Sequence, residues 1–297
     1  MAHVPVLLKE VIDYLNPQAN ENFIDATVGE GGHALTILKL IEPNGRLLGI
    51  DLSKEIIRII AKIKNENEKL KDRLILVNDS YANLEKIVSK NDFKPVHGIL
   101  FDLGMCSWHL EASGRGFSYL RDEPLDMRFT PKNDLTAAEI INFWEIKKIE
   151  NILKEFGEEK YAYRISLAIK EARKKERIVG TQQLVNILKR VLPKNYDKKR
   201  IHFATRTFQA LRIAVNDELQ IIENGIKQAI KILEPGGKIA VISFHSLEDR
   251  IVKNIFREKA KIGELNILTK KPISPCSEEI RNNSRSRSAK LRAAEKL

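Results

Sequence analysis

A chain of 297 residues with 43% hydrophobic and 31% charged residues is long enough to bury one large core or two smaller ones. It has no apolar run of the roughly 20 residues that a membrane helix requires, so we expect a cytoplasmic protein that does not enter a membrane. Cys106 and Cys276 are isolated and lack metal-ligand spacing, which argues against a disulfide framework or a zinc knuckle, and we predict no metal site.

The net charge of +11 is informative about which molecules the protein binds and not about its fold. It favours a polyanion such as nucleic acid as the binding partner, although a lysine-rich composition can also be common to all the proteins that a genome encodes. The pattern of the chain has to decide between these two explanations.

The clearest local pattern is NFIDATVGEGGH, residues 22–33. Its apolar residues predict a buried strand that ends near Asp25, and Gly29, Gly31 and Gly32 predict a tight turn into a helix beginning near His33. Glycine suits such a turn because a ligand approaches a backbone closely only where no Cβ intervenes. We therefore predict a loop that cradles a nucleotide-type cofactor.

An acidic residue follows this loop at the distance expected of a ribose-binding carboxylate. Asp51 ends the apolar run 46–50 and lies 20 residues after Gly31. The spacing G-x-G-G departs from the dinucleotide fingerprint G-x-G-x-x-G, and a glycine turn followed by a chance acid is the alternative. Together the two features favour a ribonucleotide-type cofactor on a doubly wound sheet.

The first hundred residues alternate between helical and strand patterns. Apolar residues at helical spacing predict helices over 6–14, 34–41 and 56–70. Besides the strands that end at Asp25 and Asp51, two more are predicted at 74–77 and 98–103. Asp79 and Asp102 fall at the carboxyl ends of the last two strands, as Asp25 and Asp51 do at the ends of the first two. Because parallel sheets bind ligands outside the carboxyl ends of their strands, we expect these four carboxylates to converge on one crevice.

Such a crevice discriminates between cofactors. A pyrophosphate would be repelled by several carboxylates, whereas a sulfonium with an α-ammonium group would be attracted. This favours S-adenosylmethionine over NAD, with Asp51 at the ribose hydroxyls and Asp102 near the adenine or the methionine end. The alternative is that some of these acids cap helices or pair with arginines.

From 105 to about 201 the alternation stops. Residues 108–129 are typical of a long ordered loop, and helical spacing covers 137–144, 146–156, 162–173 and 182–191, with Thr136 and Thr181 in capping positions. We therefore predict that 1–107 and 204–297 form one α/β domain, interrupted by a helical domain at 108–203. The net charge of +11 favours RNA recognition as the role of this inserted domain.

The α/β pattern then returns. One or two helices are expected over 205–233, a fifth strand over 238–244 and an amphipathic helix over 247–261. Residues 267–269 are a candidate strand, and 288–293 alternate as an edge strand does, although a short disordered basic tail explains that last segment equally well.

Several long strings, in order along the chain, resemble the bacterial small-subunit (16S) ribosomal RNA cytosine-N4 methyltransferases, the RsmH or MraW family. They are HVPVLLKEV, FIDATVGEGGHA, GIDLSKE, DLGMCSWHLEASGRGFSYLRDEPLDMRF, ATRTFQALRIAVNDEL, EPGGKIAVISFHSLEDRIVK and SRSRSAKLRAAEK. The resemblance implies a class I, Rossmann-like methyltransferase with an inserted helical domain, acting on a cytidine of the decoding region.

The resemblance also implies a set of cofactor contacts. These are Gly31, Gly32, His33, Asp51, Tyr81, Asp102 and His109. The family usually has D-L-G-V-S-S-x-Q-L-D where this chain has DLGMCSWHLE, so that His109 replaces a glutamine. A histidine can still donate or accept one hydrogen bond there.

Methyl transfer from a sulfonium is an in-line displacement, and the N4 amine of cytosine is a poor nucleophile that benefits from a hydrogen-bond acceptor. Asp102 lies at the right strand end for that role, or for positioning the cofactor alone. The Asp-Pro-Pro-aromatic string of other amino-methyltransferases has no counterpart here, so the identity of the acceptor stays open.

The fifth strand ends beside the same crevice at Phe244, His245 and Ser246, which we predict as a receptacle for a flipped cytosine. Phe244 is equally well explained as a core residue, and His245 as a helix cap. Arg206 and Arg212, with Arg285, Arg287 and 198–200, are predicted phosphate contacts, with a solvated helix face as the competing explanation.

These features predict an S-adenosylmethionine-dependent methyltransferase that acts on small-subunit rRNA or on the small ribosomal subunit. A nicotinamide-dependent oxidoreductase and a non-catalytic RNA-binding assembly factor are the alternatives. The oligomeric state does not follow from the sequence.

Overall fold

The computed structural model describes residues 5–193, 196 and 202–297. The chain divides into two compact units, an α/β unit of residues 1–104 and 219–297 and a helical unit of residues 105–218. The predicted boundary at 204 differs from the second division because helix α10 (Thr205–Asn216) packs on helices of the helical unit.

The α/β unit is built on one sheet. Its strands are β1 (Phe23–Asp25), β2 (Leu47–Asp51), β3 (Leu74–Asn78), β4 (Gly98–Asp102), β5 (Lys238–Ser243), β6 (Leu265–Ile267) and β7 (Lys290–Lys296). Its helices are α1 (Leu8–Leu15), α2 (Gly32–Leu40), α3 (Lys54–Glu66), α4 (Leu84–Lys90), α11 (Glu218–Ile232), α12 (Ser246–Lys261) and α13 (Ser277–Asn282), with 3-10 turns at Glu68–Leu70, Tyr81–Asn83 and Ser284–Ser288.

The sheet has the order β3-β2-β1-β4-β5-β7-β6, in which β7 is antiparallel to both of its neighbours. The chain moves outward from β1 to β3 and then returns to the other side of β1 with β4. This reversal is the topological switch point at which doubly wound sheets bind ligands. The predicted α/β class and the mostly parallel, doubly wound sheet are therefore confirmed.

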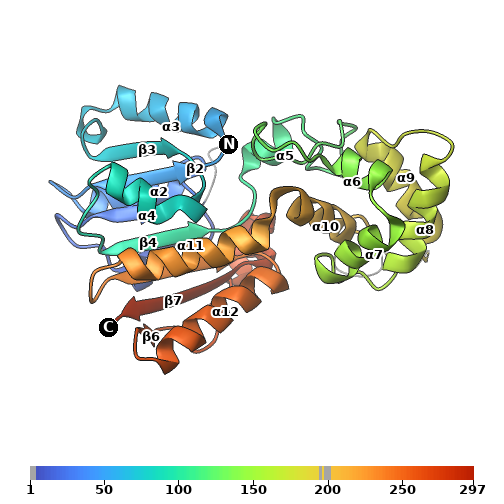
Figure 1. The fold of residues 1–297 in the computed structure, drawn as a ribbon. Helices are drawn as coiled ribbons and strands as arrows, with labels where there is room; N and C mark the ends of the chain where they lie inside the picture. The colour runs from blue at the N-terminus through green and yellow to red at the C-terminus, as the bar shows by residue number, and fades with distance from the viewer. Residues whose placement is uncertain (1–4, 194–195, 197–201) are drawn as a thin grey trace. The chain divides into compact units, whose positions relative to one another are not determined.

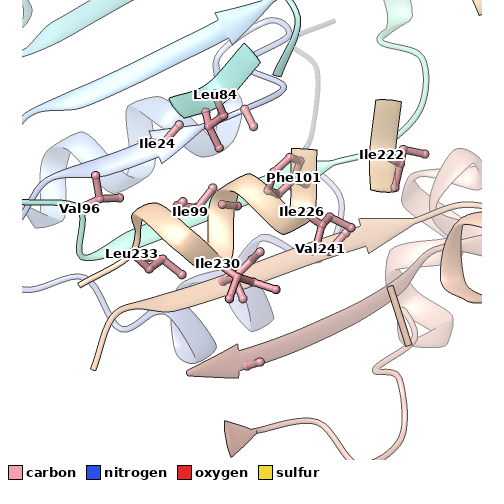
Figure 2. Packing of buried hydrophobic residues seen from close by; sticks show 14 of the residues in the cluster. Ile24, Leu84, Val96, Ile99, Phe101, Ile222, Ile226, Ile230, Leu233 and Val241 are labelled. Carbon is pink, nitrogen blue, oxygen red and sulfur yellow. The ribbon is translucent and has the colours of Figure 1, made fainter. Parts of the chain in front are cut away.

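Alternate strand residues serve the two faces of the sheet. On one face, apolar residues of α4, α11 and α12 cover the sheet, and Figure 2 shows Ile222, Ile226 and Ile230 of α11 packed over the central strands. The opposite face carries α1, α2 and α3. Figure 1 shows α11 and α12 lying along the sheet beside β4 and β7.

The C-terminal segment differs from its prediction in two ways. The strand pattern at 288–293 corresponds to β7, which begins at Lys290 and lies between β5 and β6 rather than at the edge. The edge strand is β6, which begins two residues before the predicted strand at 267–269. Because Ala293 and Ala294 of β7 are buried in the sheet, the alternative of a disordered tail is wrong.

The helical unit contains α5 (Ser107–Glu111), α6 (Ala137–Phe143), α7 (Ile146–Glu155), α8 (Ala162–Arg173), α9 (Thr181–Val191) and α10, around a hydrophobic core of its own. Thr136 caps α6 as predicted, in a capping box with Glu139. Thr181 does not cap α9, because Gly180 is the N-cap and the Thr181 hydroxyl donates to the Arg121 carbonyl instead. Asp217, with φ of 50°, separates α10 from α11.

Candidate active site

Three carboxylates at the carboxyl ends of β1, β2 and β4 form what we call the carboxylate cluster, namely Asp25, Asp51 and Asp102. In the parallel register Asp25 pairs with Gly49 and with Leu100, each two residues before the other two acids of the cluster. Since side chains alternate along a strand, all three carboxylates lie on the same face, the one that carries α1, α2 and α3.

Asp79 does not belong to this cluster, so the expected convergence of four carboxylates is wrong. In the register of β2 and β3 it is Asn78 that pairs with Asp51, and Asp79 follows one residue later, out of phase. Its Oδ1 accepts hydrogen bonds from the backbone of Ser80 and from the side chain of Asn83. Asp79 therefore stabilises a local turn.

The glycine loop joins β1 to α2 in the predicted manner. Gly29 and Gly31 have φ of 50° and 86°, a region that favours glycine. A Cβ on Gly31 would come within 2.6 Å of Ile60, and one on Gly32 within 2.3 Å of Pro5. The close packing of this turn places the first residues of α2 beside the carboxylate cluster.

Asp51 joins the glycine loop to the start of α3. Its Oδ1 accepts a hydrogen bond of 2.8 Å from the Ser53 backbone, and its Oδ2 accepts one of 3.3 Å from the Gly29 backbone. Burial raises the pKa of Asp51 to about 6, and these two hydrogen bonds limit the rise. The carboxylate thus has a fixed orientation at the carboxyl end of β2.

Asp25 is the most deeply buried member of the cluster, at 1% exposure. Its Oδ1 accepts a hydrogen bond of 3.1 Å from the Thr27 backbone, and the Thr27 hydroxyl accepts one of 2.6 Å from the Asp102 backbone. Burial, with repulsion from Asp51, raises the pKa of Asp25 to about 7. Thr27 thereby connects the ends of β1 and β4.

Asp102 has the highest pKa of the three carboxylates. Burial raises it to about 8, with further contributions from the charges of Asp25 and Glu248. Its side chain is 20% exposed, yet its Oδ1 is buried and has no hydrogen-bond partner among the described residues. A buried carboxylate oxygen in this state is an acceptor available to a ligand.

His33 lies beside the cluster, whereas Tyr81 packs on the other face of the sheet, against the hydrophobic residues under α11. The His33 Nε2 lies 3.0 Å from the Val6 carbonyl, to which it donates, and its Nδ1 lies 3.7 Å from Oδ2 of Asp102. The Tyr81 ring packs edge-on against Phe101 of β4, and a Cβ on Gly225 of α11 would come within 2.5 Å of that ring. Both predicted contacts therefore lie at the carboxyl edge of the sheet.

The segment after β5 contributes a further acid that the sequence analysis missed. Glu248 is buried, and its Oε2 accepts hydrogen bonds from the backbones of Phe244 and His245. His245 is the N-cap of α12, and its Nδ1 accepts a hydrogen bond of 3.4 Å from the Glu248 backbone. The capping alternative for His245 is thus observed.

Neither of the other two residues of the predicted cytosine receptacle is fully buried. Phe244 is half-buried and packs on the cluster of hydrophobic residues under α1 and α2, and a Cβ on Gly104 would come within 3.2 Å of its ring. Ser246 is exposed. Phe244 is thus only partly a core residue, and it lies where β4 ends.

Comparison with known proteins decides the family. The model of the MraW methylase family matches residues 1–297. The chain is 47% identical over 295 residues to a ribosomal RNA small subunit methyltransferase H of Persephonella marina, covering 99% of both chains. It is 43% identical to the protein of that name from Halothermothrix orenii, covering 100% of this chain and 99% of the relative. This chain belongs to the MraW methylase family.

A solved structure agrees on the fold. The structure of a protein described as an rRNA methylase from Clostridium thermocellum superposes with a TM-score of 0.50 at 14% identity, covering 100% of this chain and 98% of that chain. Membership of the MraW methylase family makes this chain an S-adenosyl-L-methionine-dependent methyltransferase. The nicotinamide-dependent and non-catalytic alternatives are therefore wrong.

The carboxylate cluster fits the cofactor of the MraW methylase family. Three carboxylates whose pKa values are raised by burial make up a site that favours a cation, and S-adenosyl-L-methionine carries a sulfonium and an α-ammonium group. The unpartnered Oδ1 of Asp102 supplies a free acceptor. Asp51 has a fixed orientation at the same site, and its predicted contact with the ribose hydroxyls stays a prediction.

His109, which the resemblance implied as a cofactor contact, lies in the helical unit. It is buried, its Nδ1 lies 3.1 Å from Sγ of Cys106, and its ring contacts Trp108, Phe117 and Phe129 edge-on. The histidine is therefore part of the aromatic packing of its own unit. Its predicted contact with the cofactor stays a prediction.

The predicted phosphate contacts differ in their surroundings. Arg212 forms a bidentate ion pair with Glu218, at 2.8 and 2.9 Å, and is largely buried. Arg206 donates to the Glu158 carbonyl at 2.5 Å and is partly exposed. Arg285 and Arg287 are exposed in the 3-10 turn before β7, and residues 198–200 lie outside the described residues.

Part of this site follows from the sequence and part does not. Glu248 was missed because an acid in the first turn of a helix is typical of a solvated cap. Thr27 was missed because its hydroxyl acts between two strands that are 75 residues apart in the chain.

Within the described residues no helix is both long and apolar enough to span a membrane.

Proposed function

We propose that this chain methylates the N4 amine of a cytidine in the decoding region of small-subunit ribosomal RNA. Two relatives that it matches over nearly their whole length, at 43% and 47% identity, carry the name ribosomal RNA small subunit methyltransferase H. The motifs that resemble the cytosine-N4 methyltransferases run from the N-terminal segment to β7. We expect the protein to work in the cytoplasm, where its substrate is assembled.

The observation that carries this proposal is the unpartnered Oδ1 of Asp102 at the switch point of the sheet. S-adenosyl-L-methionine supplies the electrophilic methyl group on a positively charged sulfur. Asp51 holds the ribose, and the negative charge of the cluster favours the cationic end. Asp25 is fixed by Thr27 and helps to set the ionisation of Asp102.

Asp102 then has two ways to assist the substrate. Its raised pKa makes it a better proton acceptor than an ordinary aspartate, and a cation beside it favours the ionised form. A carboxylate that accepts a hydrogen bond from the N4 amine increases the electron density on nitrogen and can take a proton after transfer. Without that hydrogen bond it still orients the cofactor.

Phe244 is the residue we assign to the base. It is half-buried at the end of β5, beside Gly104 at the exit of β4, and thus on the same edge of the sheet as Asp102. An aromatic face at this edge can stack on a cytosine that has left its helical stack. Arg206 of the helical unit, partly exposed, is proposed to contact RNA phosphates.

The test is to map the methylated nucleotide. Small ribosomal subunits from cells that lack the gene are incubated with the purified protein and methyl-labelled S-adenosyl-L-methionine, and the rRNA is digested and analysed by mass spectrometry. We expect N4-methylcytidine at a single decoding-region position. Label on another base, on ribosomal protein, or on no component of the particle would contradict the proposal.

A further inference from the structure

A second charged feature of the α/β unit lies away from the carboxylate cluster, at the edge of the sheet. It is a cavity of about 350 Å³ between α12, the edge strand β6 and β7. Its lining includes Lys253 and Arg257 of α12, Asn266 of β6, Lys270 just after β6, and Arg292 of β7. We call it the α12–β6 groove.

The sequence explains why the basic residues gather there. In α12, Val252, Ile255 and Phe256 face the sheet and are buried. Lys253 and Arg257 are four residues apart, so their side chains share one face of the helix. Phe256 and Leu265 form the apolar floor of the groove, and the polar ends of Lys253 and Arg257 stay in solvent above it.

Three of the four cations that line the groove are uncompensated. Arg292 forms an ion pair with Asp249, at 2.6 and 3.2 Å, which accounts for its charge. Lys253, Arg257 and Lys270 form no ion pair or side-chain hydrogen bond with any described residue, and no acidic side chain lines the groove.

Three acids near the groove, Asp249, Glu258 and Glu264, act on other cations. Glu264 pairs with Lys259 at 2.8 Å, and Asp249 holds Lys290 as well as Arg292. Glu258 acts on Lys227 of α11 and therefore lies on the side of α12 that faces that helix. The groove thus keeps its positive charge in the folded protein.

Its shape and chemistry suit an extended polyanion. Two cations at helical spacing and a third across the cavity can neutralise consecutive phosphates, and β6 adds the unpaired side of an edge strand. A small anion would use one or two of these groups, whereas a phosphodiester chain can use all of them. The net charge of +11 favours the same class of ligand.

We propose that the α12–β6 groove binds the phosphodiester backbone of the substrate RNA, apart from the nucleotide that is methylated. This rests on the proposed function for the identity of the RNA. The groove supplies affinity without reading bases, because phosphate contacts position a protein on nucleic acid and carry no sequence information directly. It is separate from the arginines that the sequence analysis singled out.

The test compares two triple variants with the same loss of charge. The groove variant is Lys253→Gln, Arg257→Gln and Lys270→Gln. The control is Arg58→Gln and Lys62→Gln in α3 with Lys86→Gln in α4, three exposed cations that also form no ion pair in the described structure. Binding to naked small-subunit rRNA and to assembled small subunits is measured over a range of salt, with S-adenosyl-L-methionine titration as a check of folding.

For the groove variant we expect affinity for both RNA samples to fall by about 10-fold or more. The slope of log K against log salt should decrease by about 2, since each lost phosphate contact removes roughly 0.7 to 0.9. Cofactor affinity should not change, and in methyl transfer the KM for the subunit should rise at constant kcat. The control should bind RNA nearly as the unaltered protein does.

Equal losses in the two triple variants would overturn the proposal, because the effect would then be one of net charge. A loss confined to assembled subunits would also overturn it, since the partner would then be a ribosomal protein. The two proposals fail separately, because a protein that binds rRNA through the groove but transfers no methyl group contradicts only the proposed function.

Discussion

The carboxylate cluster and the α12–β6 groove lie in the same α/β unit and carry opposite charges. The cluster is buried, and its carboxylates have pKa values of about 6 to 8 because burial and mutual repulsion disfavour their ionised forms. The groove cations are on the surface, where water already stabilises their charges. Burial therefore gives the cluster a strong dependence on pH, and exposure gives the groove a strong dependence on salt.

The difference shows how one unit can serve two oppositely charged ligands. A small cationic group, such as a sulfonium or an ammonium, needs only a few hydrogen-bond acceptors in fixed positions. The carboxylates at the ends of β1, β2 and β4 supply them. A polyanion needs many weak contacts spread over a surface, and long side chains on a helix supply those. Each of the following experiments tests one side of this contrast.

The largest effect is expected from Asp51→Ala. We propose that Asp51 accepts hydrogen bonds from two ribose hydroxyls, so its removal should weaken S-adenosyl-L-methionine binding by about 100-fold or more, since a hydrogen bond to a charged group contributes about 1.5 to 3 kcal/mol. RNA binding should not change. Isothermal titration measures the first quantity and filter binding the second.

Asp79→Ala is the matched control for that experiment. Asp79 also follows a strand of the sheet, but its carboxylate stabilises a local turn through Ser80 and Asn83. We expect cofactor binding within about 3-fold of the unaltered protein, because the typical effect of losing one such local hydrogen bond is a small loss of stability. If the two variants lose affinity equally, the assignment of the cluster is wrong.

Asp102→Asn should mainly reduce turnover. It keeps the shape of the side chain but removes its charge and its ability to take a proton, and general-base assistance typically contributes about 100-fold or more to rate. We expect kcat to fall by roughly that factor, with a smaller change in cofactor affinity. A normal kcat with weakened cofactor binding would restrict Asp102 to positioning.

The response to salt should separate the two sites directly. Between about 50 and 200 mM salt, cofactor affinity should change by no more than about 3-fold, because buried charges are screened much less than exposed ones. Affinity for small-subunit rRNA should fall by about 10-fold or more over the same range. A flat response of RNA binding would remove the claim that phosphate contacts dominate it.

The smallest effect concerns the stability of the protein without cofactor. Between the pKa of an unfolded aspartate, near 4, and the raised values of the cluster, the folded state binds more protons than the unfolded state. The free energy of unfolding therefore decreases as the pH rises from about 5 to 8.5, and the Tm should fall with it. Asp25→Asn should flatten this dependence, as scanning calorimetry can show. An unchanged slope would mean that Asp25 has an ordinary pKa.

Local patterns of the chain predict much of this fold. Apolar runs identify the strands, and the glycines at 29, 31 and 32 identify the turn, because buried strands and positive φ each require particular residue types. Ser53 at the cap of α3 shows the limit of such patterns, since α3 begins two residues before its apolar spacing does. Helix ends depend on single hydrogen bonds that periodicity does not contain.

Features that depend on pairing between distant segments could not be predicted. The phase of Asp79 relative to Asp51 depends on the register of β2 and β3, and the place of β7 inside the sheet depends on which strand it joins. Arg212 looks like a surface cation in the sequence, and only the turn at Asp217 brings it to Glu218. Residue types indicate such chemistry, but tertiary structure decides the partner.

The most direct test of the central claim is the affinity for S-adenosyl-L-methionine as a function of pH, measured by isothermal titration in buffers of different ionisation enthalpy. We predict that binding becomes tighter as the pH rises from about 5.5 to 8.5, with net release of protons near pH 7, because the cationic cofactor favours the ionised forms of Asp25, Asp51 and Asp102. A dissociation constant that does not change over this range, with no exchange of protons, would contradict the account.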